Sequence, residues 1–304
     1  MSAPSTFDRL RDPSERTLAV LLLAPAFALL ALIVVYPIGK LVWNSFFDLR
    51  LSGGSGGVKF VGWENYALVL TDKSFWNATK NTVLITLITV PGALVVGLGL
   101  AMLANLPFRR QWPVRLALLL PWALPLSFAG LIFAWFFHTE YGVVNDVVRR
   151  LGLASAAEPT MWLLKPNWAF AAICLTIIWK TSSFMALILL AGLQMIPKSL
   201  YEAAEVDGAS KWQQFWQITI PMLMPSIIVA LIFRTITALQ TFDIPYTMTK
   251  GGPGEATETL AMLIHKTTID YLDVGYGSTL AVFMFLLSLV VTAVYLRRIG
   301  RNAG

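Results

Sequence analysis

Lys180 lies near the middle of a long apolar stretch, where a charge is unfavourable unless it faces a cavity or a partner. Its neighbours are Trp179, Thr181 and Ser182. Hydroxyl groups beside an aromatic ring suit a sugar, which has one apolar face and a rim of hydroxyls. We therefore predict that these four residues line a pathway for a polar solute. In the alternative interpretation, the hydroxyls bond to their own helix and Trp179 faces lipid.

A second cation, Arg234, lies at a comparable depth in the next apolar stretch. Thr235 and Thr237 are close to it in sequence, and Gln240 and Asp243 follow where that stretch ends. Two cations do not pair with each other, so Arg234 requires either the pathway or a carboxylate of a companion subunit. We predict that Arg234, Gln240 and Asp243 also belong to the solute pathway.

A mostly polar segment, residues 198–221, separates these two apolar stretches. Pro197 precedes a predicted helix from about Lys198 to Val206, and Asp207-Gly208 should end it, because glycine tolerates the positive φ of a helix C-terminus. A second short helix is predicted from Ser210, a good N-cap, to Thr219. Small side chains and carboxylates on the first helix would let a basic partner approach closely. The alternative is a solvated loop that only joins two spans.

The spacing in this segment resembles the EAA motif of binding-protein-dependent ABC importer permeases. The motif reads Glu-Ala-Ala, three residues, Gly, nine residues and Ile-x-Leu-Pro, and here Ile220 replaces the Leu. The matching residues are Glu202, Ala203, Ala204, Gly208, Ile218 and Pro221. In that family the segment is a coupling helix that docks on a cytoplasmic ATPase. The resemblance therefore implies that these six residues, together with Asp207, couple the chain to an ATPase.

Composition and hydropathy predict an all-α, polytopic membrane protein. Of the 304 residues, 57% are hydrophobic and only 13% charged, well below the charged fraction of soluble domains. Six stretches are apolar and long enough to span a membrane. They are Leu18–Val42, Thr82–Leu106, Leu116–Phe137, Trp168–Met195, Met222–Leu239 and Gly277–Leu296. The coupling segment falls between the fourth and the fifth.

The basic residues indicate the orientation. If the N-terminus is inside, the cytoplasmic segments have roughly twice the density of Lys and Arg found in the loops on the other side. We therefore predict a multi-pass protein with both termini in the cytoplasm, and the resemblance implies that its membrane is the bacterial inner membrane. The net charge of +6 reflects this distribution and does not indicate nucleic-acid binding. The predicted division is a cytoplasmic segment at 1–17, a permease domain at 18–296 with its core at about 82–296, and a cytoplasmic tail at 297–304.

The resemblance extends over nearly the whole chain. The stretches FVGWENY, LLAGLQMIPKSLYEAAEVDGAS and TKGGPGEATETL are similar to sugar-type permeases of the MalF or UgpA type. The resemblance implies a MetI-like fold and a role as a permease for a sugar, oligosaccharide, polyol or sugar phosphate. It also implies a heterodimer with a second homologous permease, two ATPase subunits that use ATP and Mg, and an extracytoplasmic solute-binding protein.

Other chemistry finds no support in the sequence. No Walker pattern is present, so we expect the chain to bind no nucleotide or other cofactor, and no metal or nucleophilic constellation is apparent. A membrane enzyme is therefore disfavoured. A self-sufficient secondary transporter using Lys180 and Arg234 remains as the alternative function, although such a carrier would need no ATPase-docking helix. The sequence does not name the sugar.

Overall fold

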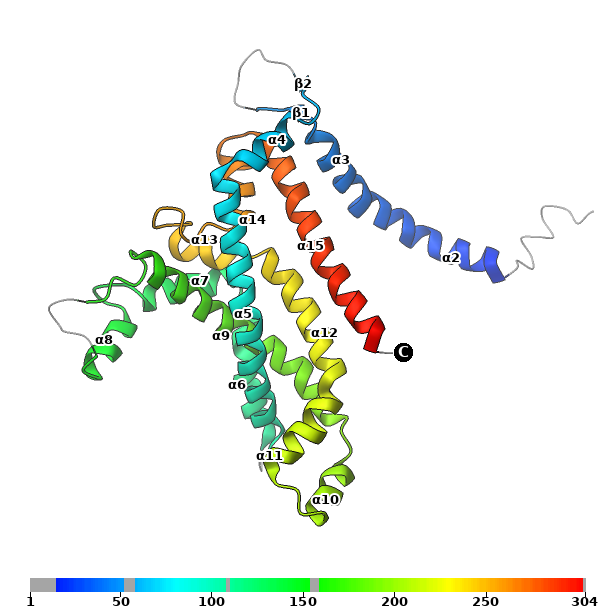
Figure 1. Cartoon of the computed structure of the whole chain (residues 1–304), viewed down its shortest axis with the longest axis vertical. Helices are drawn as coiled ribbons and strands as arrows, with labels where there is room; N and C mark the ends of the chain where they lie inside the picture. Colours follow the sequence, from blue (N-terminus) through cyan, green and yellow to red (C-terminus); the bar gives the residue numbers. More distant parts are fainter. Residues whose placement is uncertain (1–14, 52–57, 108–109, 154–158, 303–304) are drawn as a thin grey trace, which may run out of the picture.

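The chain folds as an elongated helical bundle, as Figure 1 shows. The computed structural model describes residues 15–51, 58–107, 110–153 and 159–302. Five helices in this part are long and apolar enough to cross a membrane, and one shorter apolar helix accompanies them. The first of the long helices consists of α2 (Glu15–Leu30), a π-helical turn η1 (Ala31–Val35) and α3 (Tyr36–Asn44). The others are α5 (Lys73–Asn105), α9 (Pro166–Gln194), the helix that ends in α12 (Ile220–Leu239) and α15 (Val274–Asn302). The all-α prediction is confirmed.

The predicted third span is broken in the middle. Instead of one helix over Leu116–Phe137, the structure has α6 (Gln111–Ala123) and α7 (Leu126–Phe136). Pro125 has no N–H to donate and forces the preceding residue, Leu124, out of the helical region (ψ 141°). The prediction of one continuous helix here is wrong, because hydropathy responds to apolar content and not to this backbone break.

Close packing of α5 against α9 forms the centre of the bundle. Ala93, Gly97 and Ala101 recur at intervals of four residues on one face of α5 and are fully or almost fully buried. Small residues at this spacing let two membrane helices approach closely. A Cβ placed on Gly97 would lie 2.6 Å from the Cβ of Met185 on α9. The helices are therefore in contact backbone to backbone.

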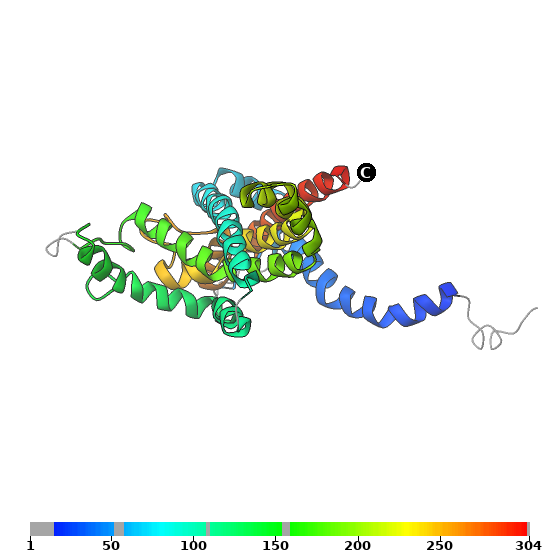
Figure 2. The same ribbon diagram turned by 90° about the horizontal axis from the view of Figure 1, so that it is seen from below.

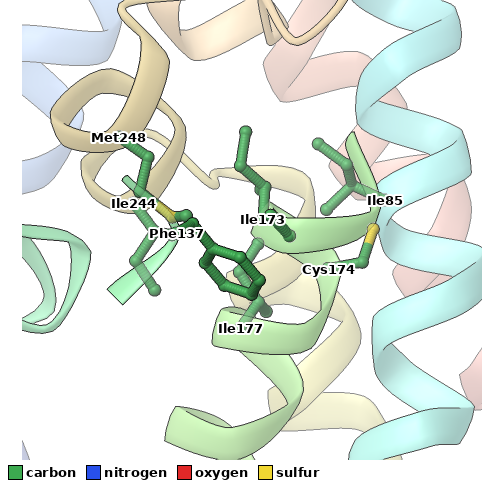
Figure 3. Packing of buried hydrophobic residues seen from close by; sticks show 8 residues of the cluster. Ile85, Phe137, Ile173, Cys174, Ile177, Ile244 and Met248 are labelled. Carbon is green, nitrogen blue, oxygen red and sulfur yellow. The ribbon is translucent and has the colours of Figure 1, made fainter. Parts of the chain in front are cut away.

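A second apolar cluster joins α5 and α9 to shorter elements. Figure 3 shows Ile85 of α5 and Ile173, Cys174 and Ile177 of α9 converging with three residues from other segments. Those three are Phe137, Ile244 and Met248. The latter two lie on α13 (Asp243–Thr249), so this cluster fixes α13 beside the α7 and α9 helices.

The loops at one end of the bundle fold into short elements. Two antiparallel strands of two residues each, β1 (Phe47–Asp48) and β2 (Lys59–Phe60), pair with one another, and α4 (Glu64–Thr71) follows them. Helix α14 (Leu260–His265) continues into the π-helical turn η3 (Lys266–Asp270). Helix α8 (Val143–Arg150) lies in the connection between α7 and α9.

The N-terminal helix diverges from the bundle. In Figures 1 and 2, the C-terminal end of α3 lies beside the upper part of α15, and α2 extends away to one side. Within the part of this candidate span that the structure describes, none of its most apolar 18-residue stretch is buried. Side chains such as Leu22 and Phe27 are more than half exposed. Among the described residues, α3 packs against α15, whereas α2 packs closely only against the adjoining turn η1.

Candidate functional site

The predicted coupling segment folds as an elbow between two helices, at the end of the bundle opposite α4. Its first arm is α10 (Lys198–Val206), the range predicted from the sequence, and it begins after Pro197. Gly208 has φ +78°, and the N–H of Ala209 donates to the carbonyl of Ala204 at 2.8 Å. The predicted glycine break is therefore confirmed.

The second arm begins with a capping box. The Ser210 hydroxyl accepts from the Gln213 N–H at 3.3 Å, and the Gln213 side chain accepts from the Ser210 N–H at 2.8 Å. The predicted N-cap is confirmed, but the predicted short helix is not a separate element. Helix α11 (Lys211–Gln214) passes through the π-helical turn η2 (Phe215–Thr219) directly into α12. A π turn shifts the bonding pattern by one residue, which accommodates Pro221 without ending the helix.

The motif residues divide into an exposed group and an anchoring group. Glu202, Ala203 and Asp207 are exposed, and Val206 between them is 89% exposed. Ile218 packs instead against a buried apolar cluster of the bundle that includes Leu189 and Leu223. The elbow therefore presents carboxylates and an apolar tip while its base is fixed to the bundle.

A hydroxyl pair and an ion pair also hold the two arms. The Tyr201 hydroxyl and the Thr219 hydroxyl lie 2.9 Å apart, which ties α10 to η2. Lys211 donates a hydrogen bond to Glu205, and this interaction lowers the pKa of the Glu205 carboxyl. Both members of the ion pair are exposed, so it contributes little to stability.

A cavity of about 460 Å³ lies between the middle of α9 and the end of α12 far from the elbow. Its polar lining consists of Lys180, Thr181, Arg234, Thr237, Gln240, Thr241 and Asp243. The aromatic rings of Trp122, Phe184 and Phe242 complete much of the wall. The structure thus brings together five of the seven residues predicted for the pathway.

Trp179 and Ser182 lie outside this lining. The Trp179 ring packs against Phe133 at a centroid distance of 4.9 Å. Ser182 is 2% exposed, and its hydroxyl donates to the Trp179 carbonyl at 3.0 Å, as in the alternative of bonding to its own helix. Sequence reasoning missed Trp122 and Phe242, whose rings come from other elements. No local sequence pattern indicates that these two rings line the cavity.

The two cations in the cavity are buried and held by neutral groups. The Lys180 ammonium donates to the backbone carbonyl of Trp122 at 2.8 Å. That carbonyl is free because α6 ends one residue later. The Arg234 guanidinium donates to the hydroxyls of Thr89 at 3.0 Å and Thr181 at 3.2 Å, and more distantly to Thr237 at 3.5 Å.

Among the described residues, one carboxylate lines the cavity, that of Asp243 at the start of α13. It accepts from the Ser127 hydroxyl at 2.8 Å, which joins α13 to the beginning of α7. In the part of the chain that the structure describes, no three His, Cys, Asp or Glu residues are grouped as metal ligands would be. The arrangement can bind a polar or charged solute, and its aromatic walls can pack against an apolar face.

Comparison with known proteins identifies the family. Residues 93–300 match the model of the inner membrane component of binding-protein-dependent transport systems. The chain belongs to this family. It is therefore a multi-pass inner-membrane permease of an ABC importer and a transport subunit, not an enzyme. A self-sufficient secondary transporter does not depend on a binding protein, so that alternative is excluded.

Relatives cover almost the full length. The permease is 69% identical over 286 residues to the sulfoquinovosyl glycerol transport system permease of Agrobacterium fabrum, covering 94% of this chain and 91% of that protein. It is 38% identical over 288 residues to the trehalose/maltose transport system permease of Thermococcus litoralis, covering 94% and 95%. A crystal structure of a bacterial alginate ABC importer has the same fold, with a TM-score of 0.80 at 21% identity and coverage of 97% and 98%. The predicted MetI-like permease fold is confirmed.

Proposed function

We propose that this permease forms half of a heterodimeric pore that imports a sugar or glycoside, with ATP and Mg bound by two ATPase subunits docked on the elbow. The observation that carries this proposal is the elbow itself. Its carboxylates and Val206 are exposed, and Ile218 and Tyr201 fix its base to the helices that line the cavity. A rigid connection of this kind can transmit movement of a docked ATPase to α12 and Arg234.

Two features support a companion permease. Helix α2 is apolar and exposed, and no other helix of the described residues packs closely against it. The cavity is also incomplete on one side, because Trp122, Thr237 and Gln240 line it and are exposed. A second homologous permease would cover both. An external solute-binding protein would then deliver the solute at the α4 end, with the elbow and both chain termini in the cytoplasm.

The first solute to test is sulfoquinovosyl glycerol, because the relative at 69% identity is named for its transport. Trehalose and maltose are the second choice, from the more distant relative. Aromatic rings beside hydroxyls and amides in the cavity suit either kind of glycoside.

The coupling role is tested by the Glu202→Lys variant. Charge reversal on the docking face should reduce ATPase co-purification and lower solute-stimulated ATP hydrolysis roughly 10-fold. This is the effect expected from the loss of one charge-assisted hydrogen bond at an interface. Glu64→Lys, the same reversal on the exposed first turn of α4 at the other end of the bundle, is the matched control for ATPase co-purification, because that end does not contact the ATPase. The measurement uses the full complex in proteoliposomes with its binding protein. Equal co-purification and equal stimulated turnover in both variants would refute docking at the elbow.

A further inference from the structure

Lys180 and Arg234 carry hydrogen-bond donors for which the described part of the chain provides no acceptor. Both side chains are more than nine-tenths buried. An ammonium has three N–H donors and a guanidinium five. Lys180 places one donor on the Trp122 carbonyl and Arg234 places three on threonine hydroxyls. Within the described residues, two donors of each cation therefore have no acceptor.

The two charges are also uncompensated. No salt bridge to Lys180 or Arg234 exists in the part of the chain that the structure describes. The carboxylate of Asp243 lines the same cavity but accepts from Ser127, and one carboxylate does not balance two cations. A buried, unpaired charge is strongly unfavourable. The described residues therefore do not supply the missing negative charge.

The backbone near these two cations also carries a partial positive charge. Helix α7 begins beside the cavity at Leu126, and no side chain caps its N-terminus. The first N–H groups of a helix and the positive end of its dipole favour an anion. Broken membrane helices place such ends near the midplane, where transporters hold charged solutes.

We propose that Arg234 and Lys180 form an anion subsite in the cavity, which holds the sulfonate of a sulfonated glycoside during transport. The inference rests on the proposed function and makes it more specific, since the permease itself, and not only a binding protein, would select the acid group. A sulfonate offers three oxygen acceptors to the four free donors. Trp122 and Phe242 would pack on the sugar ring, and Asp243 would accept from its hydroxyls.

The test measures binding to the purified full complex in nanodiscs without the binding protein. Equilibrium dialysis compares labelled sulfoquinovosyl glycerol with glucosyl glycerol, the same glycoside with a hydroxyl in place of the sulfonate. The wild-type complex should prefer the sulfonated ligand roughly 10-fold to 100-fold, the range expected for charge-assisted hydrogen bonds. Arg234→Gln and Lys180→Gln should each remove most of this preference, and Arg234→Lys should retain part of it. Lys80→Gln, the same loss of charge on an exposed position of α5, should leave the preference unchanged.

Three outcomes overturn the subsite: no preference in the wild-type complex, no binding of either glycoside, or an unchanged preference in the Gln variants. If Arg234→Gln does not assemble, Lys180→Gln and the wild-type preference decide the question. Uptake in proteoliposomes with the binding protein separates this inference from the proposed function. ATP-dependent uptake of any glycoside without an anion preference in the cavity rejects the subsite alone, whereas absence of all glycoside uptake rejects the proposed function.

Discussion

Gly97 should be the position on α5 least tolerant of a single added methyl group. A Cβ there would lie 2.6 Å from the Cβ of Met185, 2.9 Å from the carbonyl oxygen of Ser182 and 3.1 Å from the amide nitrogen of Ala186. Ordinary carbon contacts are about 3.5–4.0 Å. All three opposing atoms belong to the α9 backbone or are bonded to it directly, so no side-chain rotation can relieve the overlap. Gly97→Ala must instead push α5 and α9 apart.

The expected cost follows from that separation. Overpacking of a well-packed core typically costs about 1–3 kcal/mol, and here the loss extends along the small-residue face of α5 from Ala93 to Ala101. We expect Gly97→Ala to destabilise the permease by about this amount and Gly97→Leu to prevent assembly. The control is Gly99→Ala on the same helix, because nothing lies within 4 Å of a Cβ at that position.

The assay is thermal unfolding of the detergent-purified complex, followed as the fraction that still elutes as an assembled peak after heating. Gly99→Ala should melt at or slightly above the wild-type temperature, since alanine is the better helix former. Gly97→Ala should melt clearly lower. Identical melting of the two variants would mean that α5 and α9 do not approach as closely as the backbone distances indicate, and the reasoning would fail.

Two further predictions concern the elbow. Gly208 has φ +78° with open space around it, so Gly208→Val should destabilise the permease by about 1–2 kcal/mol through backbone strain alone. The Val variant should also reduce stimulated ATP hydrolysis in the reconstituted complex more than Gly208→Asn does. Equal effects of the two variants would contradict this prediction. Because Lys211 lowers the pKa of Glu205, the stabilisation from this pair is present above the ordinary glutamate pKa and is lost as the pH falls through the lowered value. Lys211→Gln should therefore melt slightly below wild type at about pH 7, and the two should melt equally once the pH is below the lowered Glu205 pKa; a difference that persists there would exclude the ion pair as its cause.

The elbow could be predicted from sequence because its structure is local. A proline start, a glycine end and a serine cap act within a few residues, and the limits of α10 follow from them. The uninterrupted passage from Lys211 into α12 could not be predicted in this way. It depends on a π-helical turn, and packing of Ile218 against α9 stabilises that geometry. Local chemistry fixes the ends of these helices, and tertiary contact decides whether they join.

The cavity shows the opposite balance. The position of Lys180 and Arg234 deep in the membrane can be predicted from the apolar stretches around them. Their neighbours in sequence, however, were a poor guide to which other residues line the cavity. Successive helix residues are rotated by ~100°, so Trp179 and Ser182 turn away from the direction of Lys180. The remaining wall comes from Trp122 and other elements distant in sequence. No pattern within α9 specifies that set.

The break between α6 and α7 explains how a lysine remains at this depth. A broken helix leaves carbonyls without partners, and a buried lysine leaves donors without acceptors, so each feature alone is unfavourable in a membrane. Here the Lys180 ammonium meets the freed carbonyl of Trp122, 58 residues away in sequence. Each defect partly satisfies the other. Hydropathy treats Pro125 as a minor interruption and Lys180 as an isolated penalty, so neither signal by itself reveals the pair that positions the cation in the cavity.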